Sequence, residues 1–171
     1  MKLIFVTGIP QIDRKTIINL SLQRAGRKQD FSVIDFDEIE SIHEGIGEIE
    51  DMESAKSVLS KFYGRIEKSL ISELKRQKGD MAISGHLTFV TKHGYERAMP
   101  DDFFRSFKPD MIVLIEKTED KIDQKIAEHQ LINRYYAAIA SAAAGSSLKI
   151  IKFRENRMME TVEELSAVMK S

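Results

Sequence analysis

The sequence predicts a doubly wound α/β domain built on a parallel sheet. Five short runs with strand character are spread along the chain, and four of them are strongly apolar. Their apolar character is continuous rather than alternating, which is typical of strands that are buried on both faces of a parallel sheet. Segments with helical spacing separate these runs, so the order strand, helix, strand predicts right-handed crossovers, with ligands beyond the carboxyl ends of the strands.

The five expected strands follow one another at intervals that leave room for a helix between them. They are Lys2–Thr7, Phe31–Phe36, Met81–Ser84, Met111–Glu116 and Leu148–Phe153.

Helical patterns lie between and after these strands. Ser57–Gln77 carries one apolar stripe opposite Lys, Arg and Glu side chains. A second helix is expected from Thr118, its predicted N-cap, to about Ala144, with Gly145 as the stop signal. The stripe of the first helix consists of Leu59, Phe62, Ile66, Leu70 and Leu74, and that of the final segment of Met158, Val162, Leu165 and Met169.

Length and composition limit the class of protein. The 171 residues suit a single domain over residues 1–171, and the net charge of −1 gives no reason to expect nucleic acid as a partner. Without cysteine there is neither a disulfide framework nor a thiolate zinc site. No apolar run approaches the ~18 residues of a membrane span. We therefore expect a soluble, cytoplasmic protein that does not bind a membrane.

The stretch "LIFVTGIPQIDRKTI", Leu3–Ile17, has the outline of a phosphate-binding loop. The motif G-x-x-x-x-G-K-[ST] uses glycines so that backbone N–H groups converge on phosphates, a lysine for charge, and a hydroxyl for Mg²⁺. Counted from Gly8 without a gap, Asp13 falls on the second glycine, Arg14 on the lysine and Lys15 on the hydroxyl position. Alternatively, Lys15 and Thr16 form the Lys-Thr pair and the loop is one residue too long.

The carboxylate of Asp13 weighs against phosphate binding. At about 4 Å from one phosphate charge it costs roughly 4 kcal/mol at an effective dielectric of 20. Arg14 or Lys15 could offset this repulsion, or Asp13 could pair with one of them. Taken alone, these residues favour an ordinary strand-to-helix turn over a working loop.

Four other segments change that interpretation. Together with "KLIFVTGIP", the segments "GHLTFVTKHGYERAMP", "PDMIVLIE" and "EHQLINRYYAAIASAAAGSSLKIIK" resemble the archaeal type of adenylate kinase, as does the final "ETVEELSAVM". The resemblance runs from residue 1 to residue 170 and is weakest between about Glu38 and Lys56. It implies a P-loop NTPase-like three-layer domain with a five-stranded parallel sheet.

The chain departs from this family at the positions that carry the chemistry. The family's loop reads G-x-P-G-x-G-K-[ST], whereas this chain keeps Gly8 and Pro10 and then has Gln11, Asp13, Arg14 and Lys15. The family's Asp-Thr-His after the third strand is replaced by Ser84, Gly85 and His86. The family's arginine-bearing lid is expected to be absent near residues 121–128, and the acidic stretch "EGIGEIEDMESAK" has no arginine to receive a nucleoside monophosphate.

The residues expected to contact a nucleotide come from this resemblance and from the loop. They are Gly8, Pro10, Arg14, Lys15, Thr16, His86 and Arg134. No catalytic residue and no metal ligand is identified.

Other polar residues are given structural roles instead. Helix capping is expected of Asp35 and Asp37, and packing on the sheet of Tyr135 and Tyr136. Structural hydrogen bonds are expected of His129, Gln130 and Asn133.

Three functions remain open. The leading hypothesis is an adenylate-kinase-like P-loop protein with lost or strongly reduced phosphotransferase activity. Such a protein either retains weak binding of ATP or ADP with Mg²⁺ or serves as an interaction or regulatory scaffold for a protein partner. The alternative is an active nucleotide kinase or ATPase with a phosphate site rebuilt around Arg14 and Lys15. The third is a binding role that involves no nucleotide.

Overall fold

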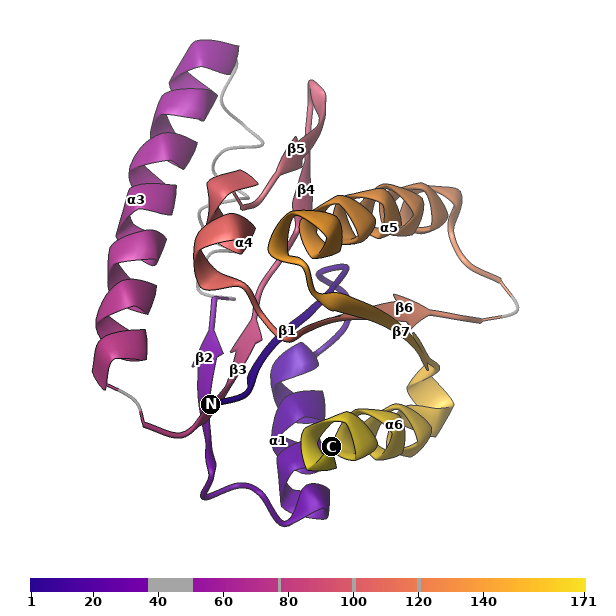
Figure 1. Cartoon of the computed structure of the whole chain (residues 1–171). Helices are drawn as coiled ribbons and strands as arrows, with labels where there is room; N and C mark the ends of the chain where they lie inside the picture. Colours follow the sequence, from indigo (N-terminus) through magenta and orange to yellow (C-terminus); the bar gives the residue numbers. More distant parts are fainter. Residues whose placement is uncertain (37–50, 77, 100, 120) are drawn as a thin grey trace.

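The computed structural model describes residues 1–36, 51–76, 78–99, 101–119 and 121–171 (Figure 1). Its centre is a five-stranded sheet in the order β2-β3-β1-β6-β7, and every neighbouring pair is parallel. This confirms the predicted fold class. The strands are β1 Leu3–Gly8, β2 Phe31–Asp35, β3 Asp80–Ser84, β6 Met111–Lys117 and β7 Ser147–Phe153.

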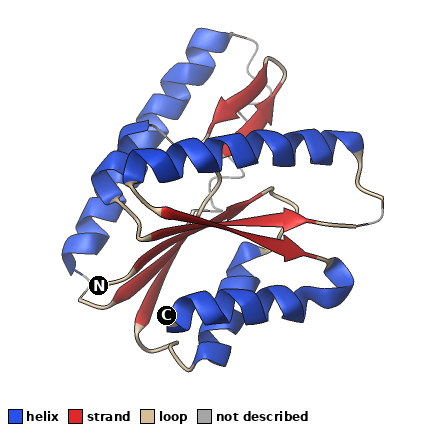
Figure 2. Ribbon diagram, turned by 45° about the vertical axis from the view of Figure 1, so that its right-hand side comes forward, coloured by secondary structure: helices blue, strands red, loops and turns tan. Residues whose placement is uncertain are grey.

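Helices cover both faces of this sheet. Figure 2 shows the sheet between α5 above and the pair α1 and α6 below. The bounds are α1 Arg14–Ala25, α3 Met52–Arg76, α4 Asp101–Phe107, α5 Gln124–Ala144 and α6 Met158–Lys170, with a short 3₁₀ turn at Glu155–Arg157. The side chains of the predicted stripe on α3, Leu59 to Leu74, lie outside the described residues, as do Asp37 and residues 44–50 of the acidic stretch.

The core forms two layers because successive side chains of a strand point to opposite faces. In β1, Phe5 faces α4, where its ring meets the edge of Phe104 at a centroid distance of 5.1 Å. Its neighbours Ile4 and Val6 face α1 and α6 and pack with Val162 and Leu165. The continuous apolar runs of the sequence are therefore explained by burial on both sides.

Three features differ from the sequence prediction. A two-stranded antiparallel hairpin, β4 Thr88–Thr91 with β5 Gly94–Arg97, follows β3, and α4 follows the hairpin; neither was predicted. The N-cap of α5 is Asp123 and not Thr118, because the Asp123 carboxylate accepts from the backbone N–H groups of Lys125 and Ile126. Thr118 instead donates its backbone N–H to Phe153 in β7, so it belongs to the sheet edge.

The stop signal of α5 is as predicted: Gly145 takes the left-handed conformation at φ 69° and closes the helix. Among the helices described, none has the length and apolar character needed to cross a membrane.

Candidate functional site

The altered phosphate loop lies at the carboxyl end of the sheet. Residues 9–13 connect β1 to α1, and Gly85 and His86 follow β3, the strand beside β1. Ile9 and Ile12 are 1% exposed and belong to the core under α1 and α6. Two of the five loop side chains thus anchor the loop in the protein interior.

Arg14 is fully buried, at 0% exposure. Its Nη1 donates to the carbonyl oxygens of Gly8 at 3.2 Å and Ile9 at 3.0 Å, and its Nη2 approaches Nε2 of His86 at 2.9 Å. The loop therefore turns two carbonyl groups toward a cation of its own chain. A phosphate-binding nest has the opposite polarity, since its N–H groups point inward to an anion.

Several N–H groups of the loop and first helical turn are already bonded within the chain. Ile12 donates to Ile9 O at 3.2 Å and Arg14 to Ile12 O at 2.8 Å. Thr16 donates to Oδ1 of Asp13 at 3.0 Å, and Ile17 to Asp13 O at 3.2 Å. In this conformation these four donors do not converge on a common point where phosphate oxygens could be held.

Asp13 is the N-cap of α1. Its carboxylate occupies the place at the helix N-terminus where the dipole and the exposed N–H groups favour an anion. A phosphate would have to displace this carboxylate or lie beside it. The fit of a nucleotide's phosphates to the loop in this conformation is therefore poor.

Gly8 is required by packing. It pairs with Ile115 across β1 and β6, and a Cβ at this position would lie 2.8 Å from the carbonyl oxygen of Ile115. The glycine therefore permits close approach of two strands, which is a role independent of any ligand.

Gly8→Ala is expected to lower the free energy of unfolding by about 1–3 kcal/mol, because the strands must separate to admit the methyl group. Gly64→Ala is the control: it lies inside α3 with nothing within 4 Å, and should stabilise by about 0.5–1 kcal/mol. Urea unfolding measures both. Equal effects of the two substitutions would contradict the packing role of Gly8.

The other predicted loop residues lie at the surface. Pro10, Lys15 and Thr16 are exposed. The ammonium of Lys15 lies 3.7 Å from the Asp35 carboxylate at the end of β2. Lys15 was predicted to contact a phosphate and Asp35 to cap a helix, and in the structure the two form an ion pair. Lys15 and Thr16 lie at the surface in the first turn of α1, while Arg14 turns inward.

His86 is 1% exposed and lies against Arg14 at the end of β3. The preceding Gly85 lets this segment pass close to the core, since a Cβ there would lie 3.2 Å from Phe5 and Met99. The structure thus brings together Gly8, Arg14 and His86 of the predicted site.

Arg134 is held away from this group by Glu116. Nε and Nη2 of Arg134 donate to the two carboxylate oxygens at 2.8 and 2.6 Å, and Lys152 donates to the same carboxylate at 2.9 Å. Burial by itself would raise the pKa of Glu116, but the hydrogen bonds from both cations outweigh it and hold the pKa below its usual range. Glu116 is 4% exposed, and its pairing with Arg134 was not predicted from the sequence.

The α5 residues that were given structural roles, His129, Gln130 and Asn133, bond within the protein. Gln130 brackets Lys117, accepting from its N–H at 2.5 Å and donating to its carbonyl at 3.1 Å. Thr88 donates to Oδ1 of Asn133 at 2.5 Å, so the hydroxyl accepts from Nε2 of His129 at 3.0 Å. Burial lowers the pKa of His129 and keeps its ring neutral at pH 7. This network ties the hairpin to α5.

Beyond the ends of β6 and β7 lies an open hollow of about 400 Å³. It is lined by Thr118, Glu119, Arg154, Glu155, Asn156 and Arg157. Its charges are of both signs, and Glu119 and Glu155 pair with Lys117. Within the described ranges, no group of three acidic or histidine side chains is placed to bind a metal ion.

A family model described as "AAA domain" matches residues 36–141. The chain belongs to this family. Within it the chain is a divergent adenylate-kinase-like protein, and its similarity to adenylate kinases extends over nearly its whole length. It is 27% identical to an adenylate kinase of Pyrococcus abyssi over 187 residues, which cover 97% of this chain and 94% of the relative.

Two further relatives agree. The chain is 27% identical to an adenylate kinase of Pyrococcus furiosus over 97% of its length and 94% of the relative's. It is 24% identical to an adenylate kinase of Methanocaldococcus jannaschii, over 99% of this chain and 98% of the relative. The adenylate-kinase-like assignment made from the sequence segments is therefore confirmed.

Proposed function

We propose that this adenylate-kinase-like chain has lost, or strongly reduced, phosphotransferase activity and binds adenine nucleotides weakly or not at all. Its role would then be that of a scaffold for a protein partner. The observation that carries the proposal is the position of Arg14. Its guanidinium is buried and donates hydrogen bonds to two carbonyl oxygens of the phosphate loop.

Catalysis by P-loop enzymes consists almost entirely of positioning the phosphates and neutralising charge that develops on them. Here Arg14 is hydrogen-bonded to loop carbonyl groups and Lys15 is paired with Asp35. The Asp13 carboxylate stands at the N-terminus of the helix. To admit a phosphate, the loop would have to break the bonds of Arg14 and move Asp13.

The connection between β6 and α5 supports the same proposal. In the family that the sequence resembles, this connection carries the lid. β6 ends at Lys117 and α5 begins at Gln124, so residues 118–123 join them. A closing lid excludes water and supplies arginines to the transferring group. Six residues give little chain from which to build one.

Thermal unfolding with nucleotide tests the proposal directly. With a Kd above 1 mM, 1 mM Mg-ATP stabilises by less than about 0.4 kcal/mol, which raises Tm by less than about 2 °C. With a micromolar Kd the same ligand stabilises by about 4 kcal/mol and raises Tm by roughly 8–16 °C. We expect the small shift with ATP, ADP and AMP, and no conversion of ATP plus AMP to ADP.

A rebuilt loop provides the positive control. The variant Gln11→Gly, Asp13→Gly, Arg14→Lys, Lys15→Thr restores the G-x-P-G-x-G-K-T pattern, and cooperative unfolding shows whether it folds. We expect it to gain several degrees of Tm with Mg-ATP where the parent gains almost none. A parent that already shifts by 8 °C or more would overturn the proposal of weak binding. A parent that turns over nucleotide would overturn it in favour of an active kinase or ATPase.

A further inference from the structure

Strand β7 is the last strand of the sheet, and its outer edge has no partner strand. Of the strands that the structure describes, only β6 pairs with it. Figure 1 shows β7 running between α5 and α6. An unpaired edge presents a row of backbone N–H and C=O groups, which is a template for pairing with another chain.

The hydrogen bonds at the two ends of β7 show which of its backbone groups face outward. Ser147 donates its N–H to the carbonyl of Asp110 at 3.3 Å, and the carbonyl of Phe153 accepts from Thr118 at 2.8 Å. Because the backbone groups of successive residues point to alternate sides of a strand, every second residue from Ser147 to Phe153 faces β6. The outward-facing residues are Leu148, Ile150 and Lys152.

Most of these outward-facing groups can pair with another chain. The carbonyl of Lys152 is already used, since it accepts from the hydroxyl of Thr161 at 2.8 Å. Among the described residues, none bonds to the N–H or C=O of Leu148 and Ile150 or to the N–H of Lys152. The side chain of Ile150 is 36% exposed. The edge therefore offers the N–H and C=O groups of two residues, one further N–H and one apolar side chain.

The same edge is basic, although the chain as a whole has a net charge of −1. Lys149 and Lys152 lie on β7, and Arg154 follows it. Lys152 is paired with Glu116, whereas no ion pair engages Lys149 or Arg154 within the described part of the chain. Arg154 also lines the open hollow of about 400 Å³, where Arg157 is a second cation. A strand laid along β7 therefore meets positive charge as far as the hollow.

We propose that the outer edge of β7 binds an extended acidic segment of a partner protein, which joins the sheet as an additional strand. The backbone of this segment bonds to Leu148 and Ile150, and its carboxylates pair with Lys149 and Arg154. In strand addition of this kind the main chain supplies affinity and the side chains supply specificity. Such binding rests on the scaffold role proposed above and specifies its partner, but it does not require an inactive phosphate loop.

The charges favour this occupant over a second copy of the chain. Lysines on an edge strand keep identical edges apart, because pairing would place like charges side by side. The same lysines attract a strand that carries carboxylates. The carboxylates of the hollow do not oppose this attraction, since Glu119 and Glu155 both pair with Lys117.

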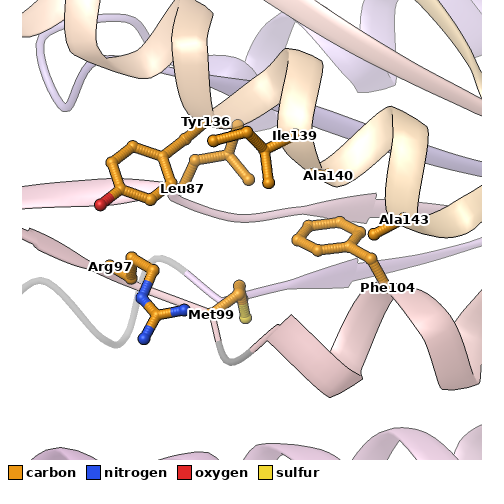
Figure 3. Close-up of a pocket in the computed structure, with 8 residues that line it drawn as sticks. All are labelled: Leu87, Arg97, Met99, Phe104, Tyr136, Ile139, Ala140 and Ala143. Carbon is orange, nitrogen blue, oxygen red and sulfur yellow. The ribbon is translucent and has the colours of Figure 1, made fainter.

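The outer side of α5 is a second exposed surface, but it does not indicate what binds there. Tyr135 is 58% exposed, so the prediction that it packs on the sheet was wrong, whereas Tyr136 packs against the core. Figure 3 shows Tyr136 and Ile139 at the edge of an apolar dimple, with Arg97 on the hairpin side. The volume of this dimple is about 20 Å³, and a small-molecule site needs roughly 300 Å³ or more.

A synthetic peptide of about seven alternating glutamate and valine residues tests the β7 edge. We expect it to bind with a Kd below about 1 mM by fluorescence anisotropy, and more weakly as salt rises from about 0.05 to 0.5 M. Two matched peptides should not bind at that concentration. One has lysine in place of glutamate, and the other is N-methylated at every amide so that its backbone cannot donate. Failure of the acidic peptide to bind, or equal binding of all three, would refute the proposal.

Substitutions in the protein locate the contact. Lys149→Glu with Arg154→Glu should weaken binding of the acidic peptide at least about tenfold. The matched control is Lys28→Glu with Lys78→Glu, which reverses two exposed charges just before β2 and β3 and should bind as the parent does. Equal losses in the two double variants would mean that the overall charge, and not β7, attracts the peptide.

Amide hydrogen exchange distinguishes strand addition from electrostatic attraction alone. With the acidic peptide bound, the N–H groups of Leu148, Ile150 and Lys152 should become protected. Those of Lys149 and Ile151 face β6 and should be protected in the free chain as well. Unchanged exchange at the three outward-facing groups would exclude strand addition. Titration with Mg-ATP tests the phosphate loop separately: a chain that binds nucleotide tightly and still takes the peptide would refute the loss of nucleotide binding and support the β7 site.

Discussion

Arg14→Met is expected to lower the free energy of unfolding by about 3 kcal/mol. The substitution keeps an apolar stem and removes the guanidinium, so the carbonyls of Gly8 and Ile9 and Nε2 of His86 lose a buried donor. Each buried acceptor left unsatisfied costs about 1–3 kcal/mol. Removing a charge from the interior offsets part of this loss. Urea unfolding at pH 7 measures the difference between parent and variant.

Arg24→Met is the matched control on the same helix. Its side chain is 47% exposed and its single ion pair, with Glu163 at 2.8 Å, lies at the surface. Exposed pairs of this kind contribute about 0–1 kcal/mol. Arg14→Met and Arg24→Met with the same unfolding midpoint would show that the buried guanidinium does not hold the loop in place.

The parallel sheet could be predicted because burial on both faces leaves a direct trace in the sequence. The run Met111–Glu116 is apolar up to Ile115 without alternation, and the observed strand β6 begins at the same residue. The hairpin β4–β5 left no such trace. Its strands have four residues each, and its attachment depends on Thr88 reaching Asn133 on α5, a contact between residues 45 positions apart.

The location of the site could be predicted, but not whether the loop turns its N–H groups or its carbonyl groups inward. Gly8, Arg14 and His86 follow the ends of predicted parallel strands and so could be assigned to one edge of the sheet, where they do meet. Whether Arg14 points to solvent or inward depends on Ile9 and Ile12, which draw the loop into the core. Ile9 and Ile12 fall on unspecified positions of the loop pattern, and their burial is a tertiary effect that the loop sequence does not show.

The orientation of the Arg134 side chain was likewise not predictable from the sequence alone. The resemblance to adenylate kinases predicts that Arg134 contacts a nucleotide. In the structure, Nε and Nη2 of Arg134 donate instead to the carboxylate of Glu116. The last residues of β6 are apolar up to Ile115, so Glu116 at 4% exposure needed a cation from elsewhere. A buried carboxylate at a strand end is itself a signal that an Arg or Lys will be found beside it.

Glu116→Gln is expected to lower the free energy of unfolding at pH 7 by about 2 kcal/mol. Removing one member of a buried ion pair costs about 3–5 kcal/mol when the other charge is left buried. Here the cost is smaller because the side chains of Arg134 and Lys152 are 48% and 55% exposed and can turn to solvent. Glutamine keeps the shape of the side chain, so a cavity does not contribute. Glu163→Gln, at a carboxylate 67% exposed, should change stability by less than about 1 kcal/mol.

The pH dependence gives a sharper test, because the sign is fixed by the pKa of Glu116. The folded protein holds this pKa below its usual range, since Arg134 and Lys152 favour the charged carboxylate more than burial disfavours it. Its contribution is therefore fully present above the unfolded value of about 4.3 and is lost as pH falls through the lower folded pKa. The gap between parent and Glu116→Gln should stay constant from about pH 7 to 5 and then close below about pH 4. A gap that widens on acidification would mean that burial dominates and that the two cations do not hold the carboxylate charged.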